Sequence, residues 1–143
     1  MKVTRLIPPG AGLLCLAVSA FLLLGCVQQA ATWSGIYAID TAGGAKTCVT
    51  ETASPPDGMT AVAKMQVSDE GGWCGILANH GGVAYDSYLM VTRPGHGKIY
   101  AHHVGANTRI DYTPDAGFVG SDTFAVRLIP GNAVVQGAVT VTR

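Results

Sequence analysis

From residue 33 to the C-terminus, short runs of Val, Ile, Tyr and Thr alternate with clusters of Gly, Pro, Asn and Asp. No segment of this region keeps the 3.6-residue hydrophobic period of an amphipathic helix. Short β-branched runs bounded by turn residues are typical of strands, and a closely spaced series of them is typical of a β-sandwich. The pattern therefore predicts an all-β fold, an antiparallel β-sandwich, rather than a series of βαβ units.

Alternation of side chains along the chain is clearest in the C-terminal half. Ile110 and Tyr112 share one face of an expected strand, whereas Arg109 and Asp111 share the other. Strands of this kind have one buried and one solvent-facing side. The expected strands are residues 33–39, 46–51, 60–67, 74–78, 85–92, 98–104, 108–113, 122–129 and 137–143.

The N-terminus has the features of a secretory signal. Two cations, Lys2 and Arg5, precede an apolar run without charge that continues to Cys26. The run is short for a membrane span, and a charged start followed by a short apolar run is typical of a signal peptide. We therefore expect residues 1–25 to be removed from the mature protein.

The end of this run, "LLGC" at residues 23–26, resembles the lipobox of bacterial lipoproteins. The resemblance implies cleavage before Cys26 and acylation of its thiol and new amino group, so that lipid anchors the chain to a membrane. Val27 follows, and the absence of Asp there favours the outer membrane. The expected location is the bacterial cell envelope, facing the periplasm or the cell surface. The alternative is an ordinary signal peptide that is cleaved a few residues later.

The predicted organisation is a signal peptide over residues 1–25, a lipidated Cys with a short tether over 26–32, and one β-sandwich domain over 33–143. Loss of the signal would leave seven Lys and Arg residues against nine acids, a net charge of about −2. A chain with this balance has no basic surface for nucleic acid, so no nucleic-acid partner is expected.

Two cysteines remain after the signal and the lipid site, namely Cys48 and Cys74. Thiols in an oxidising compartment pair by default, so we expect a disulfide between them. Neither belongs to a C-x-x-C pair, and neither has neighbours at zinc-like spacing. A redox centre and a metal site are therefore the less favoured interpretations.

The stretch "YTPDAGFVGSDTFAV" at residues 112–126 is the densest motif of the chain, and it is consistent with a folding corner. Pro114 ends a strand, because it cannot donate to a ladder. Gly117 and Gly120 allow positive φ, and Phe118 between them can fold back over the open end of the sandwich. Asp122 can accept hydrogen bonds from nearby backbone N–H groups before the next strand begins.

The same region resembles the bacterial immunoglobulin-like, cadherin-like repeats of envelope and surface proteins. Their pattern is Pro-x-His-Gly followed by Tyr-x-Pro-x-x-Gly-Phe-x-Gly-x-Asp-x-Phe. The resemblance covers roughly residues 86–143 and implies an immunoglobulin-like β-sandwich but no activity. The matching residues are Pro94, His96, Gly97, Tyr112, Pro114, Gly117, Phe118, Gly120, Asp122 and Phe124.

Candidate ligating residues are present but not in a recognised arrangement. His102 and His103 are neighbours in an expected strand and so point to opposite faces. His96 belongs to the turn motif, and the Met residues have no recognised copper spacing. Asp111, Asp115 and Asp122 could bind Ca²⁺, but turn capping is the preferred interpretation. No metal site and no cofactor are expected.

No motif of a hydrolase, a zinc peptidase or a phosphate-binding loop occurs in the sequence, so no enzymatic activity is expected. The function that we predict is a non-catalytic envelope lipoprotein, whose immunoglobulin-like module binds a protein or glycan partner or supports an envelope assembly. The alternative is a periplasmic protein that binds a small ligand or a metal through its His and Met side chains.

Overall fold

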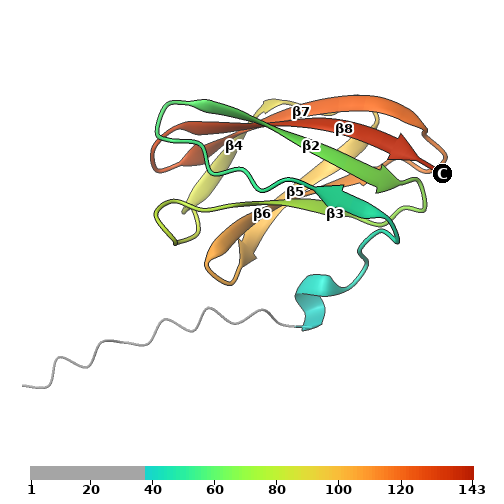
Figure 1. Cartoon of the computed structure of the whole chain (residues 1–143), viewed down its shortest axis with the longest axis horizontal. Helices are drawn as coiled ribbons and strands as arrows, with labels where there is room; N and C mark the ends of the chain where they lie inside the picture. The colour runs from blue at the N-terminus through green and yellow to red at the C-terminus, as the bar shows by residue number, and fades with distance from the viewer. Residues whose placement is uncertain (1–37) are drawn as a thin grey trace, which may run out of the picture. The chain divides into compact units, whose positions relative to one another are not determined.

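The computed structural model describes residues 38–143 (Figure 1). The predicted signal peptide, the lipidation site at Cys26 and the tether lie outside the described residues. Within the described part of the chain, no helix is long and apolar enough to cross a membrane.

The described chain forms a β-sandwich of two sheets, which confirms the all-β prediction (Figure 1). A 3₁₀ helix, η1, precedes the strands and covers Ala38–Thr41. One sheet has five strands in the order β1-β2-β8-β7-β4, and the other has three in the order β3-β6-β5. The strands are β1 (Cys48–Thr50), β2 (Thr60–Ser68), β3 (Cys74–Ala78), β4 (Ser87–Thr92), β5 (Gly97–Val104), β6 (Asn107–Pro114), β7 (Gly120–Ile129) and β8 (Ala133–Thr142).

The strand order is that of an immunoglobulin-like sandwich. The neighbours β4-β7-β8 and β3-β6-β5 correspond to the C-F-G and B-E-D orders of that architecture. Pairing is antiparallel except between β2 and β8, which run parallel from Thr60↔Val134 to Ser68↔Thr142 and lie side by side in Figure 1. Parallel strands need a long connection, and most of the described chain lies between β2 and β8.

The core lies between the two sheets and is built from alternate residues of the strands. In β8, Val135, Gly137, Val139 and Val141 are buried, and the residues that alternate with them face outward. Phe124 of β7, from the same sheet, and Ile110 of β6, from the other sheet, belong to the same core cluster. The predicted disulfide is present between Cys48 of β1 and Cys74 of β3, with 5.3 Å between the Cα atoms. It therefore joins one sheet to the other.

The prediction of a first strand over residues 33–39 is wrong at residues 38 and 39, the part that the structure describes. These two residues begin the 3₁₀ helix η1. The side chains of Trp73, just before β3, and of Arg109 in β6 donate hydrogen bonds to carbonyl groups of this segment. Trp73 Nε1 donates to the Ala42 carbonyl at 2.7 Å, and an Arg109 Nη1 donates to the Asp40 carbonyl. These bonds hold the segment against the outer face of the sheet instead of within a ladder.

The prediction that one side of β6 faces solvent is also wrong. Arg109 and Asp111 are only 8% and 4% exposed, although they alternate with the core residues of the strand. The Arg109 guanidinium carbon lies 3.7 Å from the centroid of the Trp73 ring, so this ring covers the outer face at that point. β6 is therefore buried on both faces.

Candidate functional site

The motif residues meet at one corner of the sandwich, around the Asp122 carboxylate at the start of β7. Its Oδ1 accepts hydrogen bonds from the N–H groups of Gly95 at 2.9 Å and Thr123 at 2.8 Å. Its Oδ2 accepts from the N–H of His96 at 2.8 Å and from the Tyr112 hydroxyl at 2.9 Å. One carboxylate thus links the loop before β5, the end of β6 and the start of β7.

This environment shifts the acid–base equilibria of both side chains. Burial by itself would raise the pKa of Asp122, but the donors from Gly95, His96, Thr123 and Tyr112 outweigh it and hold the pKa below its ordinary value. Burial, together with the hydrogen bond to the Asp122 carboxylate, raises the pKa of Tyr112 well above its ordinary value. At neutral pH Asp122 is therefore a charged acceptor and Tyr112 a neutral donor, as the hydrogen bond between them requires.

The aromatic part of the corner is a stack of two rings. The His96 and Phe118 rings are nearly parallel, with centroids 4.1 Å apart. Gly117 and Gly120 on either side of Phe118 have φ values of 76° and 148°, which glycine adopts without strain. Phe118 packs against the core but is only half-buried. It therefore covers the open end of the sandwich only in part.

The remaining histidines have three separate acceptors. His102 Nε2 lies 3.1 Å from Asp111 Oδ2, and His103 Nε2 lies 2.7 Å from the Tyr85 carbonyl oxygen. His80 Nε2 lies 3.0 Å from Asp57 Oδ1. Within residues 38–143, no three His, Cys, Asp or Glu side chains come together as a metal-binding group.

A buried ion pair on β6 is the feature that the sequence analysis missed. Arg109 Nε lies 2.8 Å from Asp111 Oδ1, and Nη2 donates to Oδ2 at 3.0 Å. A Cβ atom on Gly75 would lie 2.5 Å from Asp111 Oδ1, so this glycine leaves the space for the pair. The alternation of charged with apolar residues suggested exposure, and nothing local to β6 indicated that Trp73 covers it.

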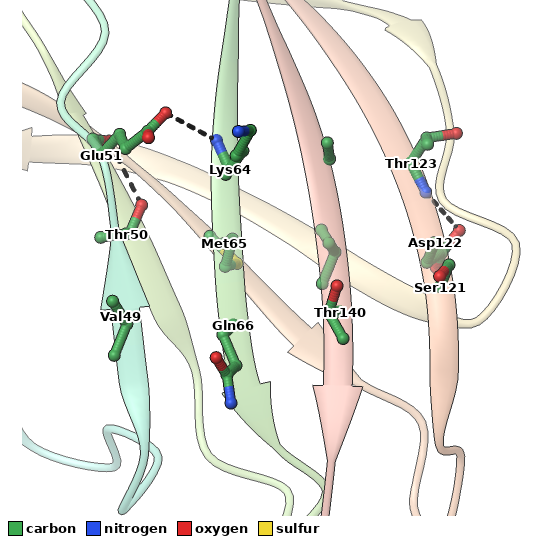
Figure 2. A pocket seen from close by; sticks show the side chains of 12 residues that line it. Val49, Thr50, Glu51, Lys64, Met65, Gln66, Ser121, Asp122, Thr123 and Thr140 are labelled. Carbon is green, nitrogen blue, oxygen red and sulfur yellow. Dashed lines mark hydrogen bonds between the residues drawn. The ribbon is translucent and has the colours of Figure 1, made fainter.

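The exposed face of the five-stranded sheet contains a hollow of about 550 Å³ (Figure 2). Strands β1, β2, β8 and β7 contribute to it, so residues from both ends of the described chain lie side by side here. Figure 2 shows Glu51 and Lys64 at one end, where the Lys64 N–H donates to Glu51 Oε2 at 3.2 Å. Most of the other polar side chains that line it are short hydroxyls and one amide: Thr50, Gln66, Ser121, Thr123 and Thr140.

The lining determines what the hollow can do chemically. Hydroxyl and amide groups both donate and accept hydrogen bonds without carrying charge. None of the twelve lining residues is a Cys that could act as a nucleophile or a His that could activate one. The rest of the exposed lining is mainly apolar, so the hollow suits a partner surface that combines apolar groups with neutral polar groups.

No protein-family model matches this sequence, and no curated protein shows significant similarity to it.

Proposed function

We propose that this protein is a non-catalytic envelope lipoprotein whose immunoglobulin-like module binds a protein or glycan partner or supports an envelope assembly. The observation that carries the proposal is the hollow on the exposed face of the five-stranded sheet, where hydroxyl and amide side chains lie among apolar ones. The polar groups of the sequence motif bind one another at the Asp122 corner instead. Folding thus accounts for the motif, and the sheet face offers the binding surface.

The lining fits a partner whose surface carries neutral polar groups. Peptide amides and sugar hydroxyls both meet this requirement, because each can exchange hydrogen bonds with Ser, Thr and Gln side chains. Binding through His and Met residues has less support, since the histidines contact three separate acceptors. A partner held on the sheet face is therefore favoured over a small ligand or a metal ion.

The membrane anchor is supported by the sequence alone. The uncharged run that ends in "LLGC" at residues 23–26 motivates it. Cys26→Ser should abolish the incorporation of a fatty-acid analogue and leave either an uncleaved precursor or protein released from membranes. Metabolic labelling of cells that express either form measures this directly. Equal labelling of the two would overturn the anchor and leave the binding surface as a separate question.

The binding surface is tested with two arginine substitutions on one strand. Thr140 lines the hollow, whereas Gln136 lies on the same exposed face of β8 and outside it. Thr140→Arg should fill the hollow and remove the partner from pull-downs of the full chain out of solubilised membranes, and Gln136→Arg should retain it. Retention by both variants, or loss in both, would contradict a site at the hollow. Stoichiometric metal in the purified protein would favour the alternative function.

A further inference from the structure

Strand β4 is an unpaired edge of the five-stranded sheet. It pairs with β7 on one side, and no strand of residues 38–143 pairs with its other side. Its side chains are unusually apolar for this position, because Tyr88, Leu89 and Val91 are all exposed. An edge of this kind presents free backbone N–H and C=O groups to any other strand.

The other free edges of the sandwich are better protected. β1 and β3 have only three and five residues, and the Cys48–Cys74 disulfide joins them. The N–H of Ala53 also donates to the Leu77 carbonyl of β3 and so occupies part of that edge. β5 carries Lys98 and two histidines. Short length and charged side chains are the usual means of preventing strand addition. β4 has no charged residue between Ser87 and Thr92, and its one protection is an irregularity between Met90 and Thr92.

The residues that flank β4 carry opposite charges. Asp86 precedes the strand and Arg93 follows it, and both are exposed. Antiparallel pairing of two identical copies places Asp86 of each beside Arg93 of the other, whereas parallel pairing would set like charges against each other. The strand and its flanks are therefore complementary to themselves in one direction only.

From this self-complementarity we propose that β4 pairs antiparallel with β4 of a second copy, about a two-fold axis near Leu89. Such an axis leaves the outer faces of both sheets on the same side. Leu89 lies on the outer face because its cross-strand partner, Arg127, is exposed. The two Leu89 side chains then meet, and the extra residue at the irregularity between Met90 and Thr92 brings Arg93 opposite Asp86 of the other copy. The two five-stranded sheets become one continuous sheet.

Site-directed cross-linking of the full chain tests the contact. Leu89→Cys should give a disulfide-linked species of twice the monomer mass on non-reducing gels of oxidised membranes. Val62→Cys is the matched control, because Val62 is 58% exposed where Leu89 is 54%, on the same sheet face but on an interior strand. The wild-type chain on the same gel shows any cross-linking that comes from the native cysteines.

A strong dimer band with Leu89→Cys and a weak one with Val62→Cys is the expected result. Equal bands for the two variants, or none for either, would overturn the proposal. A cross-linked product of a different mass would also overturn it, because another protein would then occupy the edge.

Exchange of the flanking charges tests the direction of pairing. In the Leu89→Cys background, Asp86→Arg should weaken dimerisation by roughly tenfold, because two favourable charge pairs become unfavourable. Adding Arg93→Asp should restore it, since opposite charges again face each other. If the double exchange is as weak as the single one, the two flanks do not meet and antiparallel pairing is excluded.

Discussion

At the scale of single residues, Asp122 has the most consequential environment of the motif. Three backbone donors and the Tyr112 hydroxyl converge on its carboxylate, which is almost buried. Hydrogen bonds to a charged group contribute more than neutral ones, about 1.5–3 kcal/mol each. The corner thus depends on the negative charge of this one side chain.

The lowered pKa of Asp122 has a consequence for stability in acid. Because its pKa is lower in the folded than in the unfolded protein, its contribution is complete above the ordinary value of 3.8 and is lost as the pH falls through the folded pKa. Asp122→Asn should therefore be less stable than the wild type at pH 7, by about 2 kcal/mol or more. The difference should shrink below pH ~4. Denaturant unfolding at a series of pH values measures it, and a difference that stays constant into acid would contradict the assignment.

At the scale of elements, β8 shows how a glycine can belong to the interior of a strand. The expected strand began at Gly137, whereas β8 begins at Ala133. Gly137 lies opposite Phe124, and a Cβ atom at this position would lie 2.2 Å from Cε1 of the Phe124 ring. The missing side chain makes room for a buried aromatic ring of the neighbouring strand.

Substitution of Gly137 tests this packing. In a strand interior without steric overlap, Gly→Ala stabilises by roughly 0.5–1 kcal/mol. Overlap with the Phe124 ring should reverse the sign, so that Gly137→Ala destabilises by about 1–3 kcal/mol. Gly44→Ala is the control, since its nearest side-chain atom would be 3.6 Å away. Urea unfolding compares the two, and a stabilised Gly137→Ala variant would show that the ring has room to move.

At the scale of the whole domain, the two sheets are joined differently on their two sides. The Cys48–Cys74 disulfide links β1 to β3 on one side. On the other side, β4 and β5 are free edges with a hollow of about 340 Å³ between them, lined in part by Tyr88, Ala101 and His103. One side of the sandwich is thus closed covalently, whereas the other is held by packing and by hydrogen bonds that join Tyr85, just before β4, to Thr108 of β6 and His103 of β5.

Removal of the disulfide should therefore affect the domain as a unit. The two cysteines are 26 residues apart, and closing a loop of this length contributes about 3–4 kcal/mol in the chain-entropy model. Domains of this size have roughly 5–15 kcal/mol in total. The double variant Cys48→Ala and Cys74→Ala should lower the urea midpoint strongly, and reductant should bring the wild type close to it. An unchanged midpoint in the variant would mean that removing the disulfide does not increase the conformational entropy of the unfolded chain enough to change stability.

The sequence by itself predicted the features that depend on near neighbours in the chain. Alternation with a period of two located most strands, because a strand buries every second residue. The signal-like N-terminus led us to expect an oxidising compartment and hence pairing of Cys48 with Cys74, and that disulfide is present. Pro114 and the two glycines after it predicted that the chain would leave the sheet there, and β6 ends at Pro114.

The tertiary structure decided the features that depend on contacts between distant segments. Trp73, just before β3, covers Arg109, so the charged face of β6 is buried although its pattern predicts exposure. β2 pairs parallel with β8 across most of the domain, and the hollow on the sheet face exists because those strands and β1 and β7 meet there. Local sequence determines which residues form a strand and which side of it is apolar. Which segments then cover that strand is determined by packing across the whole domain, because burial is a property of surfaces that meet only after the chain has folded.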